Sequence, residues 1–457
     1  MDQPREPEPA WWHRLSGPPR RAGKPVPPGS PAAAGSGSPA GRLRGDLLWN
    51  LGSFAFAAAA VAILNLLILR YYNRDALGVF AQVFSVYVLF SQFSALGVHF
   101  SVLQASAAHA ADRRQCGQIL AGALPLMLVL SVACAGVYWL ARWPIANWLG
   151  SPGVARGIEA STLGLLLFGI NKGLQGMVNG LEWMRSFALL QVARPVLMFA
   201  AFFVLVAAGA GGSDAAWVLT ASEAGAFVLA AGLLAARGYF VRPTREAWAW
   251  MGRHLSFGVR SFGVGALTAL STRMDVLLLG YFWSDAEVGV YALPAMIAAG
   301  LYQVLVVLRN NLNPRIVRRW ADGDRAGVET LAAQTRRRVY PLAAIAVLAI
   351  LALYWPAAGL VKHGDVIRQG WGPLAVLLLG VWAVSGYLPF NQVLMLARRP
   401  AVQSGVVVLA TAASLLANLA LVPWLGAYGA AAATSFYQVF QNLLVVLLAR
   451  RMLKLAL

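Results

Sequence analysis

The amino-acid sequence predicts an all-α polytopic membrane protein built from two related halves. Of its 457 residues, 59% are apolar and only 12% are charged, whereas soluble domains carry roughly a quarter charged residues. Apolar runs of about 20 residues recur between Leu47 and Leu448, and each is long enough to cross a hydrocarbon core about 30 Å thick. Because lipid offers the backbone no hydrogen-bond partners, such runs are expected to be helical.

The apolar runs predict about twelve spanning helices. A polar stretch in the middle of the chain separates the first six from the last six. The expected helices are 47–69, 77–101, 118–141, 157–180, 186–209, 214–236, 256–280, 287–310, 338–361, 371–396, 400–422 and 426–449.

The distribution of basic residues predicts the orientation. Of the 37 Lys and Arg residues, 28 fall in alternate segments that include both termini, and only 6 fall in the opposite loops. Because cytoplasmic loops carry the excess of Lys and Arg, both termini are expected in the cytosol of a bacterium, with the protein in its cytoplasmic (inner) membrane. The same distribution argues that the net charge of +19 serves membrane topology and not nucleic-acid binding.

A short repeat supports the division into halves. Residues 75–81 read D-A-L-G-V-F-A, and residues 285–292 read D-A-E-V-G-V-Y-A. Each copy lies in the first outer turn of its half, and six helices per half give both copies the same orientation, as in a parallel repeat. The predicted organisation is a disordered cytosolic tail at 1–45, a six-helix lobe at 46–236, a cytosolic linker at 237–255 and a second six-helix lobe at 256–457.

Signatures of enzymes and cofactors are missing. The sequence contains no phosphate-binding glycine loop with Lys and Ser/Thr, no His/Cys metal spacing and no nucleophile elbow. Cys116 is expected in a cytosolic loop and Cys134 in the membrane, so a disulfide between them is not expected. We therefore expect a non-enzymatic protein without cofactor or metal.

Ionisable residues inside the predicted helices are the candidates for function, because each costs a few kcal/mol or more unless paired or hydrated. Lys172, Arg194 and Glu223 share roughly one depth in the first half. The short turn between the fifth and sixth helices allows an Arg194–Glu223 pair, whose simplest role is to hold two helices together. Lys172 would then be an unneutralised cation, which either snorkels along its stem or lines a cavity for an anion such as phosphate.

Arg273 and Asp275 are the charged residues of the seventh predicted helix. They are two residues apart, about 200° around a helix, so they do not face each other. Both lie near the outer end of that helix, where Arg273 could snorkel outward and Asp275 could order the outer turn. The binding prediction therefore centres on the first half, and Arg273 and Asp275 remain further candidates.

The residues that follow resemble bacterial polysaccharide (oligosaccharide-lipid) flippases. The pattern of the seventh and eighth helices of that family is matched by Asp275, Gly280, Gly289, Tyr291 and Pro314. A late Asn…Pro…Gly-x-x-Gly-Ala-Ala run is matched by Asn418, Pro423, Gly426 and Gly429, and the first outer turn by Leu77–Phe80. The resemblance spans about 46–450, and its matched residues are typical of the fold and are not catalytic residues.

This resemblance implies the superfamily of multidrug, oligosaccharidyl-lipid and polysaccharide exporters, with two six-helix lobes around a central cavity and alternating access by lobe rocking. It implies a transporter that moves a polyprenyl-diphosphate-linked oligosaccharide, such as a repeat unit of O-antigen, capsule or exopolysaccharide, to the outer leaflet. The implied partners are membrane lipids and the lipid-linked oligosaccharide, with a polysaccharide polymerase and glycosyltransferases as candidate protein partners.

Two alternatives remain open. A cation-coupled multidrug exporter of the same fold is expected to need membrane carboxylates, and helix 47–69 has none beyond Asp46 at its inner end. A non-transporting scaffold could instead recruit glycan-assembly enzymes through its basic loops and tail. Loss of Lys172 would be silent in a scaffold and damaging in a flippase.

Overall fold

The computed structural model describes residues 60–360, 364–397 and 399–455. The predicted tail at 1–45 and most of the first predicted helix lie outside these residues; the described part of that helix is Ala60–Tyr71. Within the described chain, nine helices are long and apolar enough to cross a membrane, and a tenth results if the bent pair α10–α11 is one span.

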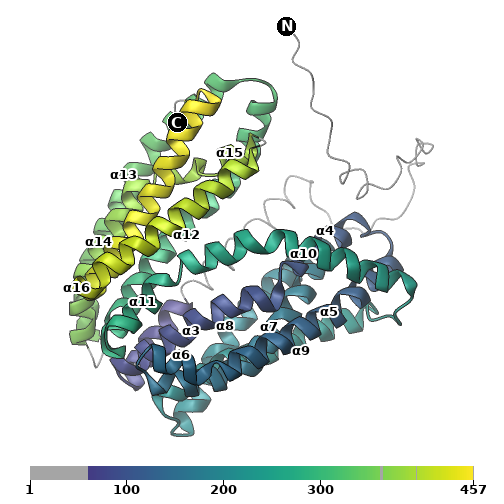
Figure 1. The fold of residues 1–457 in the computed structure, drawn as a ribbon, viewed down its shortest axis with the longest axis horizontal. Coiled ribbons are helices and arrows are strands. Elements are labelled where there is room, and N and C mark those ends of the chain that lie inside the picture. Colours follow the sequence, from purple (N-terminus) through teal and green to yellow (C-terminus); the bar gives the residue numbers. More distant parts are fainter. Residues whose placement is uncertain (1–59, 361–363, 398, 456–457) are drawn as a thin grey trace. The chain divides into compact units, whose positions relative to one another are not determined.

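The helices of the first half form one group in Figure 1. Leu96 and Gly97, both with positive φ, separate the second predicted helix into α3 and α4. The elements of this group are α3 (Arg74–Ala95), α4 (Val98–Ala108), α5 (Arg113–Leu140), α6 (Arg142–Trp148), α7 (Pro152–Gly180), α8 (Met184–Ala207) and α9 (Trp217–Ala236).

The helices of the second half form another group, in green to yellow in Figure 1. Helix α10 (Arg245–Ser271) precedes it and packs against α3, α4 and α5 as well as α16. The remaining elements are α11 (Met274–Phe282), α12 (Asp285–Ala321), α13 (Arg325–Ala357), α14 (Gly364–Val384), the short η3 (Leu388–Phe390) and α15 (Val393–Leu396), and α16 (Pro400–Leu448).

Two predicted boundaries in the second half are wrong. The basic stretch 309–338 was expected to be a loop, but it is helical except for a short turn between Ala321 and Arg325. The predicted helix 371–396 ends at Val384. The predicted division between helices 400–422 and 426–449 is confirmed, because α16 is interrupted by the non-helical backbone of Gly426 (φ 53°, ψ −128°). Charge density misled the boundary assignment at 309–338, because Arg is a good helix former.

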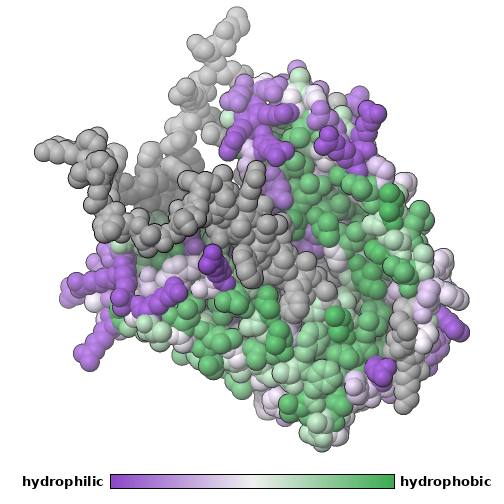
Figure 2. All heavy atoms as spheres, turned by 180° about the vertical axis from the view of Figure 1, so that it is seen from behind, coloured by the Kyte–Doolittle hydropathy of each residue, from purple (hydrophilic) through white to green (hydrophobic). Residues whose placement is uncertain are grey.

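Side-chain polarity follows the expected membrane pattern. On the face shown in Figure 2, hydrophobic side chains cover a broad continuous area, and hydrophilic ones gather at its margins. Many large hydrophobic side chains are exposed, among them Leu140, Val204, Leu353 and Leu416. Exposed apolar area of this extent is unusual in a soluble monomer and fits contact with lipid tails.

The repeat in the sequence forms a contact between the two halves. Gly78 and Gly289 occupy equivalent positions in the two copies, and α3 packs against α12 at these glycines. A Cβ on Gly78 would lie 1.8 Å from the carbonyl oxygen of Asp285, and one on Gly289 would lie 2.1 Å from that of Arg74. Glycine is therefore required at both positions so that the helix backbones can approach closely.

Candidate functional site

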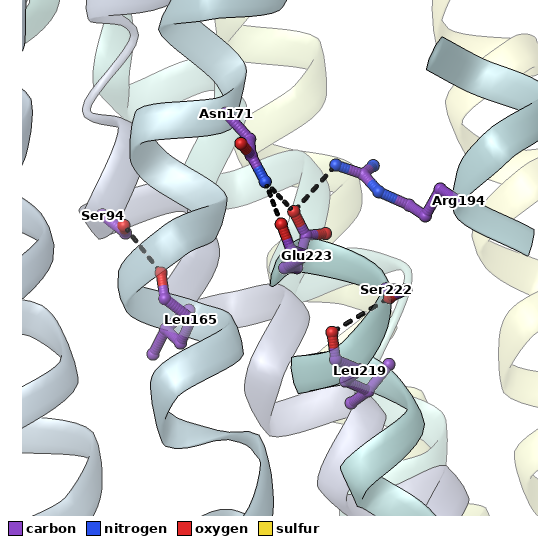
Figure 3. A network of polar contacts seen from close by, with 7 residues as sticks. All are labelled: Ser94, Leu165, Asn171, Arg194, Leu219, Ser222 and Glu223. Carbon is purple, nitrogen blue, oxygen red and sulfur yellow. Dashed lines mark hydrogen bonds and ion pairs between the residues drawn. The ribbon is translucent and has the colours of Figure 1, made fainter. Parts of the chain in front are cut away.

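A polar cluster joins α7, α8 and α9 inside the first group of helices (Figure 3). The Nη2 of Arg194 lies 3.0 Å from Oε2 of Glu223, which confirms the pair expected from the sequence. Asn171 donates from Nδ2 to the same carboxylate oxygen at 2.7 Å and to the backbone oxygen of Glu223 at 2.9 Å. Glu223 is buried with 4% of its surface exposed, so these donors replace its water shell.

Lys172 follows Asn171 on α7 and points to the same cluster. Its Nζ lies 5.2 Å from the ring centroid of Phe168, and the guanidinium carbon of Arg194 lies 5.7 Å from that same centroid. Two cations thus share one aromatic ring, whose negative face attracts them. Lys172 lies about 12 Å along the helix axis from Gly180, at about 1.5 Å per residue, which is well inside a hydrocarbon core.

The charges of this cluster do not balance. Glu223 pairs with Arg194, and no ion pair of Lys172 occurs among the residues that the structure describes. His99 lies near enough to interact electrostatically with Lys172, and its Nδ1 is buried without a hydrogen-bond partner. Two cations with a single carboxylate leave a positive site, which suits an anionic ligand group.

The two other predicted site residues lie elsewhere. Asp275 on α11 is buried and accepts hydrogen bonds from the hydroxyl of Tyr291 at 2.6 Å, from that of Thr434 at 3.0 Å and from the backbone N–H of Val276 at 2.8 Å. This carboxylate therefore connects α11, α12 and α16.

Arg273 is placed differently from the sequence expectation. It stands at the break between α10 and α11 and not within one continuous helix, with its guanidinium carbon 4.9 Å from the ring centroid of Phe84 on α3. Across the described chain, no hydrogen bond or ion pair joins Arg273 or Asp275 to Lys172, Arg194 or Glu223.

Sequence reasoning missed a second polar site, at the start of α12. Asp285 accepts a hydrogen bond from Nε2 of Gln82 on α3 at 2.6 Å and one from the hydroxyl of Ser151, just before α7, at 2.7 Å. Together with Gly78 and Gly289, these residues form what we call the α3–α12 seam. The repeated Asp and Gly were visible in the sequence, but nothing in the sequence indicated their mutual contact.

Phe168 and Asn171 were also missed as parts of the charged cluster. Phe168 precedes Lys172 by four residues, a spacing that places both side chains on one helix face, so this signal was present in the sequence. In the described residues no group of three or more His, Cys, Asp and Glu side chains could hold a metal ion.

Comparison with known proteins places this geometry in a family context. A family model described as "Polysaccharide biosynthesis protein" matches residues 47–320. Among curated proteins, none matches the sequence significantly.

Solved structures share the fold at low sequence identity. An inward-facing multidrug-resistance MATE family transporter of the MOP superfamily is 15% identical, with a TM-score of 0.73 over 90% of this chain and 94% of that one. The lipid II flippase MurJ in an inward closed conformation is 10% identical, with a TM-score of 0.70 over 88% of this chain and 87% of that one. A mutant of the Vibrio cholerae MATE transporter VcmN is 16% identical, with a TM-score of 0.60 over 90% and 97% of the two chains. These similarities confirm the predicted fold class, a two-lobed all-helical membrane protein.

Proposed function

The chain belongs to the polysaccharide biosynthesis protein family, within a superfamily of transporters, and on this premise we propose that it flips a polyprenyl-diphosphate-linked oligosaccharide across a membrane. The cargo would be a repeat unit of a surface polysaccharide such as O-antigen, capsule or exopolysaccharide. The observation that carries the proposal is the pair of cations, Lys172 and Arg194, near the ring of Phe168, with a single carboxylate that pairs with Arg194.

The chemistry of the cargo fits this cluster. A diphosphate carries negative charge that must enter a low-dielectric interior, where it needs cations and hydrogen-bond donors. Lys172 supplies a cation without an ion-pair partner in the described chain, and Arg194 is held in place by Glu223. Glu223 and Asn171 act as positioning residues, because they orient the guanidinium and limit the charge of the empty site to about one unit.

The proposed setting is the cytoplasmic membrane of a bacterium, with both termini in the cytosol. The asymmetry of 28 against 6 basic residues in alternate segments supports this orientation. Alternating access would carry the diphosphate from the cytosolic side, past Lys172, to the outer leaflet. Arg273 and Asp275 stay separate candidates for substrate contact in the second lobe, and glycosyltransferases and a polymerase stay candidate partners.

The test is flipping by the purified protein in proteoliposomes. A fluorescent undecaprenyl-diphosphate-linked sugar is placed in the inner leaflet, and its arrival outside is followed by quenching with a membrane-impermeant reagent. Lys172→Ala is expected to slow flipping at least tenfold, since a hydrogen bond to a charged group contributes about 1.5–3 kcal/mol. Lys172→Arg should retain more activity, and Arg114→Ala, at an exposed position on α5, is the matched control.

The same vesicles separate the alternatives. A cation-coupled multidrug exporter would transport ethidium in an ion gradient and would not flip the lipid. A scaffold would transport neither, and its Lys172→Ala variant would support surface glycan formation in cells at the normal level. Unchanged flipping in Lys172→Ala and Arg194→Ala would overturn the proposed role of the cluster.

A further inference from the structure

The chain between α14 and α16 breaks where a continuous helix was expected. After Val384 it passes through η3 and α15 before α16 begins at Pro400, and Gly386 and Pro389 stand within this break. Both residue types disfavour a helix interior. The N–H and C=O groups that such a break leaves without helical partners must be satisfied by neighbouring side chains or by water.

Amide and guanidinium side chains converge on this break. Arg309 on α12 donates from Nη1 to Oδ1 of Asn391 at 3.2 Å, and Asn313, one turn further along α12, donates to Oε1 of Gln392 at 3.0 Å. Gln403 in the first turns of α16 donates to the backbone oxygen of Asn391 at 3.0 Å. We refer to these five residues as the inner amide cluster.

The inner amide cluster has unused donors. Nη2 of Arg309, Nδ2 of Asn391 and Nε2 of Gln392 donate no hydrogen bond within the described chain, and none of them is among its fully buried unpaired atoms. Arg309 is bonded to Asn391, and Asn313 is bonded to Gln392, the residue that follows Asn391 in the chain, so the three donors belong to neighbouring side chains. A group of accessible N–H donors matches an oxyanion with several acceptor oxygens.

The charge of the cluster also favours an anion. In the part of the chain that the structure describes, Arg309 forms no ion pair, and all four partners in the cluster are neutral amides. A partly buried guanidinium is usually paired with a carboxylate, because burial removes water from its charge. Where no carboxylate is present, water or a bound anion must provide the hydrogen-bond acceptors. The amides of Asn391 and Asn310 accept hydrogen bonds from the Arg309 side chain without neutralising it.

The depth of the cluster identifies the chemistry of the anion. Arg309 lies about 36 Å along the axis of α12 from Asp285, at about 1.5 Å per residue. This distance exceeds a hydrocarbon core of about 30 Å, so with the start of α12 at one membrane surface, Arg309 lies at the headgroup level of the opposite leaflet. Lipid phosphates occupy that level.

From the unused donors, the unpaired guanidinium and the depth, we infer that the inner amide cluster binds the phosphate of a lipid headgroup at the cytosolic end of the second lobe. This inference rests on the proposed function for its orientation and for its role, which is to dock the diphosphate of the lipid-linked cargo before the cargo reaches Lys172. The phosphate is the recognised group, and its sources are a polyprenyl diphosphate, a glycerophospholipid or free diphosphate.

The inference is tested by binding, without any transport step. Protein carrying Lys172→Ala is placed in nanodiscs of phosphatidylcholine, so that binding at the α7–α9 cluster is suppressed, and titrated with undecaprenyl diphosphate, phosphatidylglycerol or inorganic diphosphate. Arg309→Gln is expected to weaken undecaprenyl diphosphate binding about 10- to 100-fold. Gln392→Ala should weaken it about three- to tenfold, and Arg315→Gln, an exposed arginine on the same helix, should leave it unchanged.

The arms of this experiment give distinct results. Arg309-dependent binding of phosphatidylglycerol as well supports a general headgroup-phosphate site, and competition by inorganic diphosphate supports recognition of the phosphate itself. Equal affinities in Arg309→Gln and Arg315→Gln overturn the inference, provided that both variants melt at the temperature of the parent; if Arg309→Gln melts lower, Gln392→Ala decides. Failure of flipping in the earlier assay, with Arg309-dependent binding intact, would remove the proposed function and leave the phosphate site.

Discussion

The glycine contact at the α3–α12 seam leads to a quantitative prediction about the conformational equilibrium. Gly78→Ala places a methyl group 1.8 Å from the carbonyl oxygen of Asp285, whereas ordinary contact begins at 3.4 Å. The carbonyl oxygen of Asp285 belongs to the backbone, so it cannot avoid the methyl group by a change of side-chain rotamer. Helices α3 and α12 must therefore separate by about 1.6 Å, the difference of these two distances, or the conformation must give way to one in which the seam is open.

The cost follows from the behaviour of overpacked interiors. Inserting one methyl group into a well-packed contact costs about 1–3 kcal/mol. Alanine also has a higher helix propensity than glycine, by about 1 kcal/mol, but this gain applies to both conformations because α3 is helical in each. The closed-to-open ratio should thus fall by a factor of about 5 to 150, at about 1.4 kcal/mol per tenfold.

The assay is labelling of a cysteine at the seam. Val288, one residue before Gly289, is fully buried, and the native Cys116 and Cys134 are buried as well. In Val288→Cys, the rate of modification by an impermeant maleimide reports the fraction of open seam. Gly78→Ala should raise this rate about 5- to 150-fold. Gly136→Ala on α5, where an added Cβ meets nothing within 4 Å, is the control, and equal rates in the two alanine variants would refute the packing argument.

Two further predictions concern buried carboxylates. Tyr291→Phe removes the hydroxyl that donates to Asp275 and should lower the free energy of unfolding by about 1–3 kcal/mol, measured by denaturant titration in detergent. The control is Tyr71→Phe, at an exposed position, which should leave the free energy of unfolding unchanged. Equal losses in the two variants would contradict this account. Glu223→Gln should lower the free energy of unfolding by about 1.5 kcal/mol, towards the lower end for charged hydrogen bonds because Arg194 is partly exposed. Adding Arg194→Gln to it should cost less than the sum of the single losses, and strict additivity would show that the pair is not coupled.

Much of the fold could be predicted because the membrane imposes it. A hydrocarbon core requires long apolar runs and rejects unpaired charge, so hydropathy alone locates α5, α7, α8 and α9 within a few residues, whereas the short α6 was not expected. The errors occur where this constraint ends. The segment from Arg309 to Arg338 leaves the core, and there the apolar pattern carries no information about whether the chain stays helical. The break after Val384 lies at the level of Arg309, and its Asn391 is hydrogen-bonded by Arg309 and Gln403, which are distant in the sequence.

The charged cluster could be predicted only in part. Depth along each helix placed Lys172, Arg194 and Glu223 at one level, and a short connection joined two of the three helices, so the Arg194–Glu223 pair followed from geometry. The rotation of a helix about its axis does not follow from hydropathy when most of its faces are apolar. For this reason the sequence did not indicate that Asn171 contacts the Glu223 carboxylate.

In the alternating-access cycle that we propose, the α3–α12 seam is a tightly packed contact that has to open. Close packing at Gly78 and Gly289 provides specificity, but these glycines bury little apolar surface of their own. The polar part is one carboxylate, Asp285, which accepts from Gln82 and Ser151 and is only half buried. Each such hydrogen bond is exchanged for one to water on opening, at a net cost of about 0.5–3 kcal/mol. A purely apolar seam of the same extent would open at the cost of exposing its whole surface, whereas a half-buried carboxylate at a helix start stays solvated in both states. The repeated Asp–Gly motif therefore favours a contact that is specific in geometry and weak in free energy, as the proposed alternating access requires.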